Sequence, residues 1–595
     1  MGKSQIILLA YIASLVFSAL IFKKQTQGVL RKFFLSETSA LNLAIFRIVL
    51  FGLLFTKTNE GQIYSFAGLS KTLVVPPFGS QWLLQVVPFS EPILRTVYPL
   101  FHWLCFAAMI GLATRFSSVM VALLGVYVLG IPEFFGKVNH GHHLLWFAMI
   151  LAASPCADVL SVDGIIKIFR KADAGDIDPP APSIKYSLPI RFVWMLYGLI
   201  YFFPGFWKVW DQGFNWALGE NLKYQMYQKW YELNWVPAFR IDLYPWLYKA
   251  TGMATLIFEL SFIVLIFFPF LRTVAVLGGI AFHLLTNAFM RILFFTLLVC
   301  YTAFVDWQRM FHVFGSKIFP EDLFLIYDGN CRLCRRTVAA LRTVDFLNRV
   351  QYVNAFDSKA LENFGLDRLN SGDLLKDMHA VNGKKVYRGF YAYRALISRI
   401  PLLWPVLPLL FLGPIAKIGN RIYRHVADSR TCQITTPLKP ADVVLPNGQS
   451  ILRLPVCWVG LLLLVVNSFL GFRGAVNAWP FACYPTFAYI AQDQISSIEI
   501  VIQDYHGQES TWDEHSLQNY FPKERLREMF RRILSAENAG SRESRLRGLW
   551  ESLIQKDKSF RTVNSVRFYR VSYKIEPREN WKKPFSRELL YVMKI

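Results

Sequence analysis

The chain has 595 residues, 54% of them hydrophobic and 18% charged, and it carries a formal net charge of +23. Soluble domains have about a quarter charged residues, so this composition excludes a typical soluble chain and indicates one embedded in a bilayer. The basic residues are dispersed and form no recognisable motif. This pattern argues against a nucleic-acid partner and leaves membrane lipids, with their anionic headgroups, as the expected contact.

Apolar runs of membrane-spanning length begin at the N-terminus. The run Ile6 to Phe22 is followed by Lys23, Lys24, Arg31 and Lys32. A signal peptide carries its basic residues before the apolar run, so this order favours a first membrane helix whose N-terminus lies outside. Some of the later runs are short and require a thinned bilayer or burial within the bundle. These spans are predicted at residues 41–56, 93–113, 117–131, 144–157, 188–206, 251–269, 271–288, 292–304 and 454–472.

The short loops mostly follow the positive-inside rule when residues 23–32 are placed inside, with Arg291 as the exception. This orientation places the segment after Phe304 inside and the chain past Phe472 outside. We therefore predict a mainly α, polytopic transmembrane helical bundle with two soluble domains. Its parts are an extra N-terminal transmembrane helix (1–35), a transmembrane bundle (36–308), a small α/β domain (320–438), another transmembrane helix (454–472) and a C-terminal soluble α+β domain (496–595).

Strand and helix patterns alternate in the two soluble stretches. In the first, the apolar run Pro401–Pro414 is too short to span a bilayer, and we expect packed core or a bilayer-facing helix there. The second contains the strand pattern SIEIVIQDY, the amphipathic helix pattern KERLREMFRRIL and the alternating strand pattern SVRFYRVSYKI. Both stretches therefore predict small domains with mixed secondary structure.

A Cys-x-x-Cys pair begins a predicted helix in the first soluble stretch. The apolar strand Leu323–Tyr327 leads into a turn at Asp328, and the helix starts at Cys331. The free amides and the positive end of the helix dipole favour thiolate there, so Cys331 is the expected nucleophile and Cys334 the resolving thiol. Further positive charge comes from Arg332, Arg335 and Arg336. Two alternatives stay open: inert buried thiols, and a zinc half-site completed by His425 and Cys432.

The run YDGNCRLCRRTVAALRTVD resembles the opening of the DCC-type thiol-disulfide oxidoreductases, which are small thioredoxin-like domains. The likeness continues through VNGKKVYRGFYAYRALISRIPLLWPVLPLLFLGPIAKIGNRIYRHVADSR. The resemblance implies a redox-active disulfide between Cys331 and Cys334, with Asp328 before them. It also implies a thiol or disulfide protein substrate. It implies no metal.

Ionisable side chains at membrane depth are costly, so each one in the bundle is a functional candidate. Asn139 and His140 open one span, Lys208 ends another, and His283 and Glu259 lie within two more. The predicted topology places Asn139, His140 and Lys208 on the outer side, with His283 one to two turns short of it. Other roles are the alternative: Lys208 extending to the interface, His283 as a satisfied core histidine, and Glu259 paired with a neighbouring helix. His140 could instead belong to a loop cluster or a metal site with His142 and His143.

Four runs in the bundle resemble the HTTM family, the membrane domain shared with vitamin K-dependent γ-carboxylases. They are LNLAIFRIVLFGLLF, VNHGHHLLWFAMILAASPCADVLSVDG, YFFPGFWKVWDQGFNWALG and GIAFHLLTNAFMRILFF. In those carboxylases a lysine deprotonates a reduced quinone, and its reaction with oxygen yields the base that prepares a glutamate for carboxylation. The resemblance implies that Lys208 is the base and that Asn139, His140 and His283 orient a quinone. No run matches the carboxylases' large substrate-binding region.

Three functions stay open at this stage. They are a membrane thiol-disulfide oxidoreductase, a quinone-dependent carboxylase-like enzyme, and a non-enzymatic scaffold or transporter. The predicted topology places the thiols inside and the polar cluster outside, so electrons would cross with the quinone itself or the two modules act separately. The resemblance suggests a bacterial inner membrane, and the predicted topology then makes the thiol domain cytoplasmic and places the C-terminal domain on the outer side.

Overall fold

The computed structural model describes residues 3–57, 60–86, 88–136, 141–364, 366, 376–429, 451–482, 486–577, 581 and 583–595. Within these residues, eight helices are long and apolar enough to cross a membrane. The chain is therefore a mainly α, polytopic integral membrane protein. The spans are α1 (Lys3–Ile21), α3 (Ala40–Lys57), α6 (Glu91–Ile110), α7 (Thr114–Val128) continued by α8 (Ile131–Phe134), α11 (Ile184–Gln212), α14 (Pro245–Leu265), α15 (Pro269–Met290) and α24 (Pro455–Phe472).

Two of the predicted spans form helices shorter than expected. Residues 144–157 give α9 (His142–Ala152), and residues 292–304 give α16 (Phe295–Cys300) followed by the 3-10 turn η3 (Tyr301–Phe304). The chain leaves α9 because the loop after it folds around the buried Arg47, whose guanidinium donates to the carbonyl of Cys156 at 2.8 Å. Helix α9 is almost wholly buried in the bundle, whereas α16 is buried on one face, through Leu297 and Cys300, and exposes Phe295.

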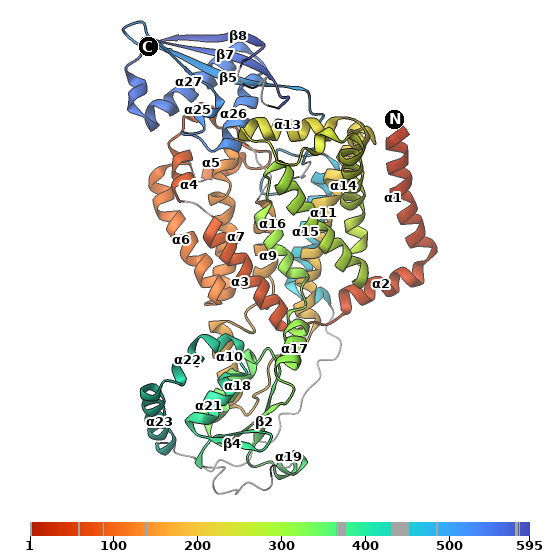
Figure 1. Cartoon of the computed structure of the whole chain (residues 1–595), viewed down its shortest axis with the longest axis vertical. Helices are drawn as coiled ribbons and strands as arrows, with labels where there is room; N and C mark the ends of the chain where they lie inside the picture. The colour runs from red at the N-terminus through yellow and green to blue at the C-terminus, as the bar shows by residue number, and fades with distance from the viewer. Residues whose placement is uncertain are drawn as a thin grey trace.

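The long helix α11 lies at the centre of the bundle and contacts α14, α24 and α9. The two soluble domains lie at opposite ends of the bundle, and the N-terminus lies at the same end as the C-terminal domain (Figure 1). The basic helix α2 (Lys23–Leu35) lies at the other end. Connecting helices at the C-terminal-domain end are α4 (Glu60–Ala67), η1 (Lys71–Leu73), α5 (Gln81–Val86), α12 (Asn215–Leu218), α13 (Asn221–Leu233) and η2 (Ile241–Leu243).

Helix α17 (Trp307–Ile318) connects the bundle to the small α/β domain, and this domain contacts α10 (Val162–Asp173). Its sheet has the order β2-β1-β3-β4, in which β1 (Leu323–Tyr327) pairs parallel with β2 (Val350–Asn354) and antiparallel with β3 (His379–Asn382). These pairings form a small α/β domain with one parallel and two antiparallel strand pairs. The remaining elements are β4 (Lys385–Arg388), α18 (Arg332–Val344), α19 (Ser358–Asn363) and α21 (Phe390–Ile397).

The apolar run Pro401–Pro414 does not form one straight helix. It forms η4 (Pro401–Val406) and α22 (Leu407–Leu410), and the chain then turns by 109° into α23 (Gly413–Asp428). Large apolar side chains of this run are exposed, among them Leu409 and Phe411, so of the two alternatives predicted for it the run is not packed core, and its exposed apolar surface agrees with a bilayer-facing helix.

The C-terminal domain is α+β, with an antiparallel sheet in the order β6-β5-β7-β8. Helices α26 (Lys523–Leu534) and α27 (Ala539–Lys556) cover one face of the sheet. In the sequence these helices follow β5 (Gln494–Gln503), β6 (Glu509–Trp512) and α25 (Glu514–Leu517), and they precede η6 (Lys558–Arg561), β7 (Ser565–Lys574) and β8 (Ser586–Lys594). The domain binds the bundle through Arg525, which donates to Glu133 at 2.8 Å and to the Pro132 carbonyl at 3.1 Å.

Candidate functional sites

The predicted thiol pair begins α18. Cys331 is the N-cap residue, and its sulfur accepts a hydrogen bond from the Cys334 amide at 3.5 Å. Asp328 supports the turn before the helix, because its Oδ1 accepts from the amides of Asn330 at 2.9 Å and Cys331 at 3.2 Å. The structure thus brings the three predicted residues together. Each of them is only 6% exposed.

A segment of the membrane domain covers the face of α18 beside the thiols. The guanidinium groups of Arg332 and Arg336 each make two hydrogen bonds to the carboxylate of Asp173, at the C-terminal end of α10, at 2.6–2.9 Å. Arg335 donates to the carbonyls of Ala172 and Gly329, each at 2.9 Å. We expected these arginines to favour the thiolate, but Asp173 offsets the charge of two of them. Their main structural effect is to dock the α/β domain on α10.

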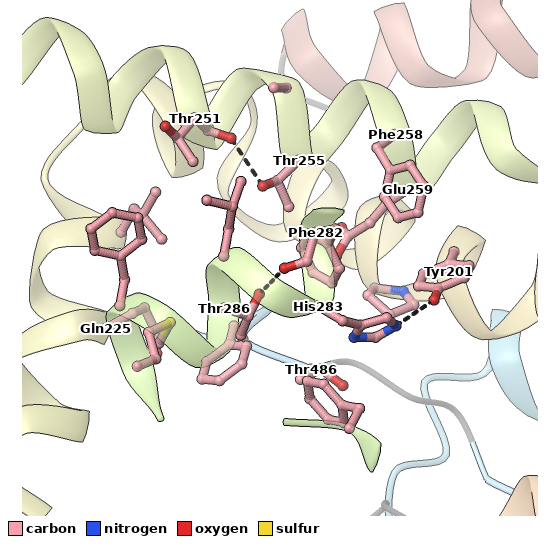
Figure 2. Close-up of a pocket in the computed structure, with 18 of the residues that line it drawn as sticks. Tyr201, Gln225, Thr251, Thr255, Phe258, Glu259, Phe282, His283, Thr286 and Thr486 are labelled. Atoms are coloured by element: carbon pink, nitrogen blue, oxygen red, sulfur yellow. Dashed lines mark hydrogen bonds between the residues drawn. The ribbon is translucent and has the colours of Figure 1, made fainter. Parts of the chain in front are cut away.

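A cavity of about 330 Å³ lies at the other end of the bundle, between α11, α13, α14 and α15 (Figure 2). Its lining is mostly aliphatic and aromatic. The polar lining groups come from His143, Tyr201, Lys208, Gln225, Thr251, Thr255, Glu259, His283, Thr286 and Thr486. Among the predicted bundle residues, Lys208 and His283 therefore share one pocket. Asn139 and His140 lie outside the described residues.

Lys208 and Glu259 form a buried ion pair in the pocket wall. The Lys208 Nζ lies 2.5 Å from the Glu259 Oε1 and 4.5 Å from the centre of the Trp216 ring. Gly205 permits this approach, because a Cβ there would lie 2.9 Å from the Cβ of Glu259. Lys208 does not extend to the interface, and Glu259 does pair with a neighbouring helix. The second carboxylate oxygen of Glu259 is buried and has no hydrogen-bond partner among the described residues.

His283 begins a short chain of hydrogen bonds in the same wall. Its Nε2 lies 2.6 Å from the Tyr201 hydroxyl, which lies 2.7 Å from the Tyr301 hydroxyl. Gly279 leaves room for Tyr301, since a Cβ at that position would lie 2.0 Å from the hydroxyl oxygen. The Nδ1 of His283 is buried with no hydrogen-bond partner among the residues that the structure describes. A polar ligand atom in the pocket would find two unused partners, Glu259 Oε2 and His283 Nδ1.

Sequence reasoning missed Tyr301 and the residues that follow α24. Tyr301 lies in an apolar run, and no sequence pattern around it indicates a function. Its hydrogen bond depends on the position of Tyr201 on α11. Thr486 and Phe487 line the pocket from a segment about 200 residues away from α15 in the sequence. Glu259 was visible as a carboxylate in an apolar run, but its partner was not.

Apolar spans around a pocket lined by buried polar groups, with a Cys-x-x-Cys pair that begins a helix in a small α/β domain at one end, define an integral membrane protein that carries a paired-thiol domain. Comparison with family models identifies two domains in the chain. Residues 36–308 match the HTTM domain, and residues 325–433 match the DCC1-like thiol-disulfide oxidoreductase. The chain thus consists of an HTTM domain followed by a DCC1-like domain, with further sequence on both sides. Searches of the curated proteins and of the solved structures found no match.

Proposed function

We propose that the protein reduces disulfides of protein substrates through Cys331 and Cys334. The Cys331 thiolate attacks one substrate sulfur and forms a mixed disulfide, and the other substrate sulfur leaves as a thiolate and is protonated. Cys334, after losing its proton, attacks Cys331, which releases the second substrate thiol and leaves a Cys331–Cys334 disulfide. Two electrons pass from the enzyme dithiol to the substrate. The observation that carries this proposal is the position of Cys331 at the N-terminus of α18, with the Cys334 amide directed at its sulfur.

The test is reduction of insulin disulfides by the purified, prereduced full-length protein. We expect Cys331→Ser to abolish turnover and Cys334→Ser to accumulate the mixed disulfide, visible by mass spectrometry. Cys105→Ala, which changes a buried cysteine of α6, is the matched control and should retain activity. Unchanged reduction by the Cys331→Ser variant would remove the proposal.

We propose further that the HTTM pocket binds a quinone. The fit rests on its apolar walls and on the two unused polar atoms, Glu259 Oε2 and His283 Nδ1, which can meet the oxygens of a quinone headgroup. A bound quinone or quinol would supply two-electron redox chemistry. Lys208 would hold or accept a proton at its Nζ, and Glu259 would keep that nitrogen in place. His283, oriented by Tyr201, would position a ligand oxygen.

Lipid extraction of the purified protein tests the ligand, since a quinone should co-purify in about one copy per chain. Lys208→Ala should retain the quinone but lose quinol-dependent turnover. A different lipid in the extract, or full turnover by Lys208→Ala, would contradict the proposal.

A quinone-dependent, carboxylase-like activity with Lys208 as base is the second candidate, favoured by the burial of this lysine in the pocket wall. Incorporation of labelled carbon dioxide into a glutamyl peptide tests it.

The two sites lie at opposite ends of the bundle, so direct contact between a pocket ligand and the thiols is excluded in this conformation (Figure 1). We propose that the DCC1-like domain faces the cytoplasm, because the basic residues of α2 lie at its end of the bundle. Labelling of an engineered cysteine in each soluble domain, in sealed vesicles of known orientation, tests this sidedness.

A further inference from the structure

A segment outside both matched domains forms part of the pocket wall. Residues 486–491, which we call the closing segment, connect α24 to the C-terminal domain. Thr486 and Phe487 line the same pocket as Thr286 and His283, and Figure 2 draws Thr486 below His283 in the view. No family model covers this segment, so the HTTM domain alone does not provide this wall.

Side chains of the bundle hold the closing segment by its backbone. Trp216 Nε1 donates to the Phe487 carbonyl at 2.8 Å, and Gln225 Nε2 donates to the Tyr489 carbonyl at 3.0 Å. The Ala491 amide donates to Asn221 Oδ1 at 2.7 Å. Gln212 Nε2 adds a bond to the Ala488 carbonyl at 2.5 Å. Because these bonds fix the backbone at successive positions, the segment is a fixed wall at the end of the pocket that faces the C-terminal domain.

On the side between α14 and α15, several residues that line the pocket are exposed rather than buried. The lining residues there are exposed on the outer surface of the bundle and are mostly small: Ala254, Gly278, Ala281 and Leu285. The lining residues on α11, including Tyr201 and Lys208, are buried. Since α14 and α15 are membrane spans, an opening between them faces lipid tails and not water.

We propose that the closing segment shuts the pocket off from the aqueous phase at the C-terminal-domain end, and that its ligand enters sideways from the bilayer between α14 and α15. The ligand class is therefore a membrane-dissolved amphiphile. Its polar head reaches Glu259 and His283, and its tail extends past Ala281. This inference rests on the proposal that the pocket holds a ligand, but the closure can be tested without one.

Closure is tested with Met226→Cys, a buried pocket residue on α13 next to the anchor Gln225. The probe is a charged methanethiosulfonate that does not cross membranes, with modification read at this position by peptide mass spectrometry. We expect no reaction in the otherwise unchanged protein. The reaction should become at least tenfold faster when Gln212→Ala and Asn221→Ala release the closing segment. Gln228→Ala, which removes only a bond to the exposed Tyr489 hydroxyl, is the control and should leave the site protected. Rapid modification of Met226→Cys alone would overturn closure.

Sideways entry is tested with Ala281→Trp, which fills the opening between α14 and α15. Binding of decylubiquinone to protein in lipid nanodiscs should weaken at least tenfold. Val274→Trp is the control, since this residue is also exposed on α15 but does not line the pocket. Equal binding by the two variants would overturn sideways entry. If the unchanged protein binds no quinone, the proposed ligand fails while the methanethiosulfonate result still decides closure.

Discussion

The Nζ of Lys208 and the Oε1 of Glu259 lie 2.5 Å apart, and their side chains are 2% and 4% exposed. Two residues that are 51 positions apart in the sequence, one on α11 and one on α14, thus contribute opposite charges to one apolar pocket. Removal of two charges from water is costly, and the pair is stable only because each charge neutralises the other. Either residue alone would leave an uncompensated charge at membrane depth.

We therefore predict that single replacements of this pair are more harmful than the double replacement. Lys208→Met or Glu259→Leu should each lower the free energy of unfolding by about 3–5 kcal/mol, because each leaves one buried charge. The double variant Lys208→Met/Glu259→Leu should recover most of the loss. Thermal unfolding in detergent, analysed as a double-mutant cycle, measures the coupling. Additive losses would show that the two side chains do not depend on each other.

Asp173→Ala should release the face of α18 from α10. The hydrogen bonds from Arg332 and Arg336 hold the pKa of the Asp173 carboxyl well below its usual range. A lowered pKa means that the contact is fully present above pH ~4 and is lost only as the pH falls through the lowered value. At neutral pH the variant should therefore expose the thiols and raise the alkylation rate of Cys331 several-fold.

The control for this docking contact is Asp178→Ala, which removes a single ion pair to Arg342 further along α18. It should have a smaller effect on alkylation of Cys331. An unchanged alkylation rate in Asp173→Ala would mean that the α10 contact does not limit access to the thiols.

The stability of the DCC1-like domain should depend on pH through Asp345, at the end of α18. Burial raises the pKa of this carboxyl to about 6. The folded domain therefore favours the neutral acid, and this contribution is fully present below pH ~4 and lost as the pH rises through about 6. Asp345→Asn should stabilise the domain at pH 8 by up to about 3 kcal/mol and have little effect at pH 4.

Hydrogen exchange of the β1 and β2 amides, followed by mass spectrometry, reports this pH dependence. Asp357→Asn is a suitable control, because asparagine retains the N-cap bond to the Ala360 amide. If the difference in hydrogen exchange between Asp345→Asn and the unchanged protein did not depend on pH, Asp345 would not be the source of the pH-dependent stability.

Tyr201→Phe should be more harmful than Tyr301→Phe. Tyr201 bonds both His283 and Tyr301, so its loss leaves two buried polar groups without this partner, whereas loss of the Tyr301 hydroxyl removes one bond. Each unsatisfied buried group costs about 1–3 kcal/mol. Tyr201→Phe should also weaken quinone binding, because the His283 ring loses its fixed orientation. Equal unfolding temperatures for the two variants would count against the chain of bonds.

The sequence allowed prediction of features that depend on local pattern. The helix over residues 523–534 and the strand over 565–574 appear where the periodicity placed them, and Cys331 begins α18 as its position after a strand and turn required. The pocket depends instead on contacts between distant segments. Nothing near Glu259 in sequence points to Lys208, and nothing near Phe487 points to Trp216. Short apolar runs were also ambiguous, since α9 is as apolar as the long spans but is a short helix buried by protein.

Helix α10 contacts α18 and so helps to determine the distance between the DCC1-like domain and the bundle. It has 12 residues and runs from the base of the bundle to the Asp173 contact with α18. A helix of that size is about 18 Å long, so the Cys-x-x-Cys pair is held at a set distance from the base of the bundle. On the proposed function, substrates tethered to the membrane would present their disulfides at that distance more often than freely diffusing ones. Insertion of seven residues into α10 would add about 10 Å with little change of helical face, and comparison of anchored with soluble disulfides would show whether this spacing selects between them.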